Sequence, residues 1–144
     1  MVHGLVSPAQ RIQQAGAIPF RRHDGELEFC LITSSSQPNF WTIPKGTIEK
    51  GDSAETTALK ETLEEAGLEG LLVNGRLGSY DYRKNGGEYE VAMYLMRVTH
   101  SLERWDESHV RKRQWVTGQS AARLLGSHPV LEIFLESQSR VPAE

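Results

Sequence analysis

The sequence predicts an α/β fold in which a mixed sheet lies between helices. Runs of apolar and β-branched residues, typical of strands, recur between turn signals in the first third of the chain and again after about residue 70. A capped helical segment begins near residue 53 and interrupts these strands. A second helical region follows the last of them, at about residues 120–137.

We expect strands at 15–22, 27–33, 71–82, 88–99 and 112–116. Pro19 lacks a backbone N–H, which favours a sheet edge or a bulge for the first of them. Asn85-Gly86 is the strongest hairpin signal in the chain, since both residue types accept the positive φ angles of a tight turn. The strand that follows this turn is apolar on both faces, which predicts a central position in the sheet.

The first helix has start and stop signals in its sequence. Asp52 and Glu55 have the spacing of a capping box, which predicts a start near Ser53. Gly67 is placed to end the helix in the left-handed conformation. In the C-terminal helical region, the segment Gly-Ser-His-Pro at 126–129 predicts a break into two helices.

The first helix carries three glutamates on one face. With Glu61 at zero, Glu64 and Glu65 lie at roughly −60° and +40° around the helix axis. The opposite face carries apolar residues that we expect to pack on the core: Leu59, Leu63 and Ala66. Three neighbouring carboxylates repel one another, so a cation is expected between them. Oxygen ligands with no histidine or thiolate nearby favour Mg²⁺, with Mn²⁺ as the alternative.

The bulk properties set limits on the class of protein. A chain of 144 residues, 38% hydrophobic and 24% charged, predicts one soluble domain over 1–144 with a core at about 10–137. The net charge of −3 argues against a nucleic-acid binder. The single cysteine, Cys30, lies in an apolar run, so we expect it to be a buried strand residue in a reducing compartment.

The sequence also bears on location. It has no pattern of a secretory signal, and no window reaches the roughly 18 apolar residues that span a bilayer. We therefore expect a cytoplasmic protein with no membrane contact, either a monomer or a homodimer.

The segment 46–68 resembles the signature of the Nudix hydrolases. That signature consists of a glycine, five residues, an acid, seven residues, arginine-glutamate-aliphatic, one residue, two glutamates, one residue, and glycine-aliphatic. The matching positions are Gly46, Glu61, Glu64, Glu65, Gly67 and Leu68. Asp52, Lys60 and Thr62 stand where the family has glutamate, arginine and an aliphatic residue. The resemblance implies a Nudix-type α/β/α sandwich with a mixed sheet and the signature helix on one side.

The resemblance also implies roles for these residues. Glu61 and Glu65 are the implied metal ligands, together with the backbone carbonyl of Gly46. Glu64 is implied as a further ligand or as the catalytic base. Glu61, Glu64 and Glu65 together form the expected catalytic set for water attack on a phosphoanhydride, a reaction in which growing negative charge must be neutralised.

A narrower resemblance covers most of the chain. The segments 31–36, 41–46, 103–107 and 111–115 look like the diphosphoinositol polyphosphate and diadenosine polyphosphate phosphohydrolase branch. By position, that branch implies six phosphate-binding residues: Arg11, Ser35, Ser36, Lys45, Lys112 and Arg113. Lys45 stands where the inositol-acting members have glycine, and lysine there looks more like the diadenosine tetraphosphate hydrolases.

Other residues near these motifs have less specific signals. Trp41 is the tryptophan best placed to stack on an adenine, and Tyr80 and Tyr82 are equal contenders, although core packing is the commoner role of such residues. Asp106 and Glu107 lie in a loop where family members often place a further metal-binding acid. We expect a solvated turn at this position.

Three functions remain open at this point. The first is hydrolysis of a polyphosphorylated small molecule, either a diadenosine polyphosphate or an inositol pyrophosphate. The second is a non-catalytic nucleotide-binding module, which the three departures from the signature favour. The third is trimming of the 5′ triphosphate of RNA, against which the acidic net charge speaks.

Overall fold

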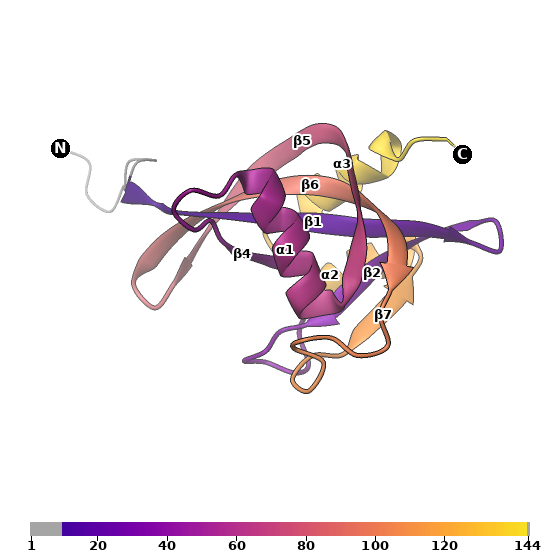
Figure 1. The fold of residues 1–144 in the computed structure, drawn as a ribbon, viewed down its shortest axis with the longest axis horizontal. Coiled ribbons are helices and arrows are strands. Elements are labelled where there is room, and N and C mark those ends of the chain that lie inside the picture. Colours follow the sequence, from indigo (N-terminus) through magenta and orange to yellow (C-terminus); the bar gives the residue numbers. More distant parts are fainter. Residues whose placement is uncertain (1–9, 144) are drawn as a thin grey trace.

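The computed structural model describes residues 10–143, which form a mixed sheet with helices on both faces (Figure 1). Helix α1 (Ala54–Ala66) covers one face, and helices α2 (Gly118–Leu125) and α3 (Leu131–Arg140) cover the other. The predicted α/β/α sandwich is therefore confirmed. Within these residues no helix is long and apolar enough to cross a bilayer.

The sheet is mixed because one of its central pairs is parallel. Its strands are β1 (Ile12–His23), β2 (Glu26–Thr33), β3 (Trp41–Thr42), β4 (Lys45–Thr47), β5 (Leu68–Lys84), β6 (Gly87–Ser101) and β7 (Arg113–Val116). The order is β3-β2-β1-β6-β5, with β4 paired to β1 and β7 paired to β2. β1 and β6 are parallel, and the other pairs are antiparallel.

Strand β6 has the central position that its sequence predicts. Val91, Met93 and Leu95 face the core beneath α2 and α3. The alternate residues Tyr94 and Met96 face the core beneath α1. All five are buried, because the strand lies between β1 and β5 and is covered on both faces. The period-two pattern of a central strand is thus confirmed.

The turn between β5 and β6 is also as predicted. Asn85 has a φ of 51° and Gly86 a φ of 80°, as a two-residue hairpin turn of this kind requires. The register continues directly from it, with Lys84 opposite Gly87. Cys30 is buried in β2, which confirms that it is a buried strand residue.

Pro19 does not mark a sheet edge, contrary to the expectation. It lies in the middle of β1, opposite Met96 of the parallel strand β6. On its other side β1 changes partner, from β4 at residues 14–16 to β2 at residues 20–23. Ala17 donates its N–H to Pro44 O on that side at 3.2 Å. An N–H at position 19 would point the same way, into the gap between the two partners, so its loss breaks no ladder bond.

Helix α1 starts one residue later than the predicted capping box requires. Ser53, not Asp52, is the N-cap, and its hydroxyl accepts the N–H of Thr56 at 3.0 Å. Asp52 instead pairs with Lys60 at 3.3 Å. The C-terminal end is as predicted, since Gly67 has a φ of 67° and donates its N–H to Leu63 O.

The buried face of α1 differs from the predicted one. Leu59 and Leu63 are each 36% exposed, at the margin of the interface. The residues that pack on the sheet are mostly small: Thr57, Ala58, Thr62, Glu65 and Ala66. The buried Thr62 hydroxyl donates to Ala58 O at 2.7 Å, so its burial leaves no unsatisfied group. Small residues bring the helix axis close to the sheet, which carries Glu65 into the protein.

This interface predicts losses of different size for two neighbouring substitutions. Ala58→Leu should reduce the free energy of unfolding by about 1–3 kcal/mol or more, because the fully buried methyl has no room to grow. Leu59→Ala should reduce it by about 1 kcal/mol or less, because that side chain is partly exposed. Denaturant unfolding of both variants measures this. A larger loss for Leu59→Ala than for Ala58→Leu would contradict the packing described.

Candidate active site

Three glutamates of α1 form an acidic row at the edge of the sheet. Glu61 and Glu64 are half-buried, and Glu65 is buried with 7% of its surface exposed. Burial raises the pKa of Glu61 above its ordinary value, and the neighbouring charge of Glu64 raises it further. The predicted convergence of the three carboxylates on one helix face is thus present, and their mutual repulsion is expressed in the pKa of Glu61.

Glu65 is the most buried of the three glutamates, and its carboxylate has two partners. Its Oε1 accepts the backbone N–H of Lys45 at 3.1 Å, and its Oε2 lies 3.3 Å from Nη2 of Arg111. Burial raises the pKa of Glu65 to about 7. Arg111 and the Lys45 N–H oppose this rise, whereas Glu61 adds to it. A buried carboxylate at the end of an acidic row is therefore held by one cation and one backbone donor.

Arg111 joins the acidic row to the strands beneath it. Its Nε donates to Glu107 at 2.7 Å, and its Nη1 donates to Thr33 O at 3.0 Å. Arg111 and Glu65 are both only about a tenth exposed. The sequence indicated Arg111 only as part of the segment 111–115. The signal that points to it is the spacing of four residues from Glu107.

Glu107 belongs to the acidic row in space, although a solvated turn was expected at this position. Its N–H donates to Glu64 O at 3.0 Å, which fixes the loop against the end of α1. The charge of Glu107 raises the pKa of both Glu61 and Glu65. Because Arg111 binds its carboxylate, the loop brings one acid and one base to the site together.

Gly46 forms the other wall of the acidic row. It lies in β4, and a Cβ at this position would overlap the carboxylate of Glu61. Only a glycine therefore lets the backbone of this turn approach the side chain so closely. The close approach brings a backbone segment and a carboxylate together, as the predicted pairing of Gly46 and Glu61 requires.

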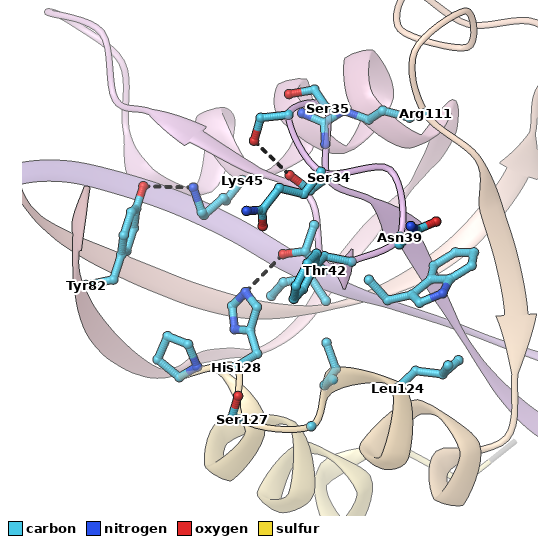
Figure 2. Close-up of a pocket in the computed structure, with 18 of the residues that line it drawn as sticks. Ser34, Ser35, Asn39, Thr42, Lys45, Tyr82, Arg111, Leu124, Ser127 and His128 are labelled. Atoms are coloured by element: carbon cyan, nitrogen blue, oxygen red, sulfur yellow. Dashed lines mark hydrogen bonds between the residues drawn. The ribbon is translucent and has the colours of Figure 1, made fainter. Parts of the chain in front are cut away.

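A cavity of about 740 Å³ lies next to the acidic row, between the β2–β3 loop and the α2–α3 connection (Figure 2). Glu65 and Arg111 belong to both the row and the cavity. Of the residues expected to bind phosphate, three line it: Ser35, Ser36 and Lys45. Aromatic and apolar side chains form much of the remaining wall: Phe40, Trp41, Tyr80, Tyr82, Leu124, Leu125 and Pro129.

Lys45 is the central cation of the cavity. Its Nζ donates to Tyr82 Oη at 2.9 Å and to Gln14 Oε1 at 3.2 Å, and Figure 2 shows it directed at Tyr82. Tyr82 in turn donates to Gln14 Oε1 at 2.7 Å and stacks on Tyr89 with 4.6 Å between ring centroids. Burial lowers the pKa of Lys45 from its ordinary value. The ammonium group is thus held in place before any ligand arrives.

His128 is a residue of the cavity that the sequence did not single out. Its Nδ1 accepts the N–H of Val130 at 3.0 Å, so the proton of the neutral ring sits on Nε2, which lies 3.0 Å from Thr42 Oγ1. Burial, with the charge of Lys45, lowers the pKa of His128 to about 4. The ring is therefore neutral near pH 7, and its role is to join the α2–α3 connection to β3.

The structure places the remaining predicted phosphate-binding residues outside this cavity. Arg11 pairs with Asp81 at 3.3 Å. Lys112 is exposed, and its backbone N–H donates to Thr33 Oγ1 at 2.9 Å. Arg113 donates to Ala66 O at 2.7 Å and so binds the free carbonyls at the end of α1, where a cation is favoured. Of the three consecutive cations at 111–113, only Arg111 lines the cavity.

The donor set suits a hard divalent cation, because it consists of carboxylates and backbone carbonyls. The raised pKa of Glu61 and the fit of Gly46 against its carboxylate favour a positive charge at this position. In residues 10–143, however, no three acidic, histidine or cysteine side chains converge closely enough to enclose an ion by themselves. Glu65 in particular is turned to Arg111 and Lys45.

The chain belongs to the Nudix family. The family model for the NUDIX domain matches residues 11–136. Among curated proteins, the chain is 35% identical over 140 residues to Nudix hydrolase 17, mitochondrial, of Arabidopsis thaliana, which covers 90% of this chain and 76% of the relative. It is 34% identical over 118 residues to the human diphosphoinositol polyphosphate phosphohydrolase 3-alpha, with 80% and 71% covered.

Solved structures agree with the fold. A C. elegans Ap4A hydrolase superposes with a TM-score of 0.75 at 21% identity, covering 92% of this chain and 99% of that one. The NUDIX domain of Shewanella oneidensis NrtR, complexed with ADP ribose, has a TM-score of 0.75 at 17% identity, covering 99% and 100%. The protein is thus a Nudix hydrolase by family and fold, and such enzymes generally use divalent cations to hydrolyse phosphoanhydrides.

Gly46 gives a direct test of the acidic row. Gly46→Ala should fold, because the overlapping group is the movable end of the Glu61 side chain, but activity should fall at least about tenfold as that carboxylate is displaced. Gly16→Ala is the matched control, since its Cβ would meet the backbone oxygen of Pro44 and destabilise the fold instead. Wild-type turnover by a folded Gly46→Ala variant, measured with melting temperature alongside, would refute the arrangement.

Proposed function

We propose that the protein is a metal-dependent pyrophosphohydrolase that cleaves a phosphoanhydride bond of a dinucleoside polyphosphate, such as a diadenosine polyphosphate, by water attack. The observation that carries this proposal is the junction of two features. The acidic row on α1 meets a cavity lined by cations and aromatic rings, and Glu65 and Arg111 belong to both.

The acidic row is proposed as the site of the divalent cation, Mg²⁺ with Mn²⁺ as the alternative. Glu61, Glu65 and the carbonyl of Gly46 are its ligands in this proposal, and Glu64 serves as a further ligand or as the base. A divalent cation in such a site neutralises charge on the phosphoryl oxygens and lowers the pKa of bound water. To bind the cation, Glu65 must share or release Arg111. The released guanidinium would still be paired with the carboxylate of Glu107.

The cavity is proposed to bind the remainder of the substrate. Lys45 and Arg111 are placed to meet the phosphates, with the serine loop at residues 34–36 beside them. Trp41, which is only partly buried, and the exposed Phe40 offer flat apolar surfaces for a nucleobase. The order from the acidic row outward is thus metal, phosphates and base.

An inositol pyrophosphate is the second candidate substrate. Its support is the identity to curated relatives with the name diphosphoinositol polyphosphate phosphohydrolase. Such a ligand carries many phosphates and no apolar surface. Among the residues that line the cavity, Lys45, Lys84 and Arg111 are cationic, and Arg111 already binds two carboxylates. The apolar wall suits a nucleoside better, so we place the dinucleotide first.

Product analysis with diadenosine pentaphosphate and Mg²⁺ tests the proposal. The wild type should yield two mononucleotides, whose phosphate chain lengths locate the attacked bond. Glu64→Gln should remain folded and lose about 10²-fold or more in kcat, the usual contribution of a positioned acid or base. Glu132→Gln, on the exposed side of α3, is the matched control and should retain wild-type turnover.

The other outcomes of this experiment are also informative. Full turnover by Glu64→Gln would remove that residue from the catalytic set. An intact dinucleotide with cleavage of a diphosphoinositol polyphosphate would make the second candidate the substrate. Tight dinucleotide binding by calorimetry with no product from either substrate would favour a non-catalytic module.

A further inference from the structure

The hydroxyl of Tyr80 is a buried polar group without a protein partner. Tyr80 lies on β5 and is 7% exposed, and it lines the cavity. Among the described residues its Oη is one of two buried side-chain polar atoms with no hydrogen bond; the other is Arg11 Nε, outside the cavity. A buried hydroxyl left unpaired is unfavourable, so a partner from outside the chain is expected.

The neighbours of Tyr80 are already committed to other contacts. Tyr82 Oη donates to Gln14 and accepts from Lys45. His128, whose ring meets that of Tyr80 edge to face with 5.8 Å between centroids, uses both ring nitrogens for Thr42 and Val130. Satisfying Tyr80 from these groups would break an existing hydrogen bond, which leaves the bound ligand as the natural partner.

The position of the phenol indicates which part of a ligand it meets. Tyr80 lines the cavity together with Lys45, Tyr82 and Glu65, and 6.2 Å separates its ring centroid from that of Tyr82, so it belongs to the part of the wall that includes Glu65 of the acidic row. Burial first, and then Tyr82 and Glu65, raise the pKa of Tyr80, so the hydroxyl keeps its proton. Lys45 belongs to the same part of the wall, and its ammonium has one N–H left after its bonds to Tyr82 and Gln14.

We propose that the Tyr80 hydroxyl donates a hydrogen bond to a phosphate oxygen of the bound substrate, beside the ammonium group of Lys45. A phosphate oxygen accepts and does not donate, and the protonated Tyr80 hydroxyl can supply the hydrogen that it needs. This assignment rests on the proposed function for the presence of a polyphosphate in the cavity. It gives Tyr80, which the sequence suggested only for stacking on a base, a role in phosphate binding.

A neutral donor has an advantage over a cation at this position. Glu65 already binds Arg111, and a further arginine or lysine in the place of Tyr80 would compete for the same carboxylate. A protonated phenol stabilises the phosphate without neutralising the acids of the row. Tyr80 and Lys45 therefore divide the task, with one hydrogen bond from an uncharged group and one from a charged group.

Tyr80→Phe tests the assignment, because it removes only the hydroxyl. Binding of inorganic tripolyphosphate and of ADP, measured by calorimetry, should weaken about tenfold, as expected for a lost hydrogen bond to a charged acceptor. KM for the hydrolysed substrate should rise by a similar factor with kcat changed less. The melting temperature of the free protein should stay the same or rise, because no protein contact is lost.

Tyr94→Phe is the matched control. The Tyr94 hydroxyl donates to Glu55 at 3.2 Å and accepts from Arg76 at 3.4 Å, beneath α1 on the opposite face of the sheet. Its loss should lower the melting temperature and leave tripolyphosphate affinity unchanged. The two variants thus have opposite expected effects on stability and affinity.

Three results would overturn the assignment. One is unchanged affinity of Tyr80→Phe for tripolyphosphate and ADP. Another is a lower melting temperature with unchanged affinity, which would show a purely structural role. The third is weaker binding of adenosine with tripolyphosphate unaffected, which would place the acceptor on the nucleoside. If the wild type hydrolyses the dinucleotide and Tyr80→Phe does so with an unaltered KM, only this inference is refuted. If Tyr80→Phe binds tripolyphosphate tenfold more weakly but the wild type does not hydrolyse the dinucleotide, only the proposed substrate is refuted.

Discussion

The burial of the Glu65 carboxylate is the constraint on which the site depends. Helix α1 approaches the sheet closely because its inner face carries alanines and threonines, such as Ala58 and Thr62. That approach carries Glu65 under the β4 turn, where Lys45 donates its N–H, and against Arg111. The same approach leaves room beside Glu61 only for a glycine at position 46. Packing and chemistry at this edge therefore follow from one contact between helix and sheet.

The cation that neutralises Glu65 also organises the loops. Arg111 reaches Glu65, Glu107 and the carbonyl of Thr33, and so joins α1, the loop before β7, and β2. Trp105 and Arg113 secure the other side of the same loop by donating to carbonyls at the end of α1. The loop that carries the fourth acid is thereby fixed against the helix that carries the other three. If a ligand displaced Arg111 from Glu65, the Arg111 side chain would still be paired with Glu107.

The sequence allowed the larger elements and the acidic row to be predicted, because both depend on local periodicity. The two faces of β6, the turn at Asn85 and the grouping of Glu61, Glu64 and Glu65 follow from residue spacing alone. The buried face of α1 was predicted incorrectly because it depends on long-range packing. Leu59 and Leu63 satisfy the helical period, but the sheet accepts the smaller residues next to them.

The cavity shows the same division between local and long-range information. Lys45 and the serine loop were predicted by position. Lys112 and Arg113 were expected at the phosphates, but of the three consecutive cations only Arg111 lines the cavity, where it pairs with Glu65 and Glu107. His128 and the unpaired hydroxyl of Tyr80 have no signal in sequence, because their environment is formed by segments nearly 50 residues apart.

The most direct test of this account is thermal unfolding of the wild type and Glu65→Gln near pH 8, with chelator and with Mg²⁺. The pKa of Glu65 in the folded protein, about 7, lies above the ordinary value of 4.5. Burial of this carboxylate therefore lowers the stability of the protein to the full extent above pH 7, where it is ionised, and has no such effect below pH 4.5, where it is protonated. In chelator near pH 8, Glu65→Gln should be more stable than the wild type by about 1–3 kcal/mol, and this gain should vanish towards pH 4.5. Arg111 is not left unpaired in the variant, because it still binds Glu107. Mg²⁺ should stabilise the wild type and not the variant. A less stable variant in chelator at pH 8, together with equal stabilisation of both proteins by Mg²⁺, would contradict the account.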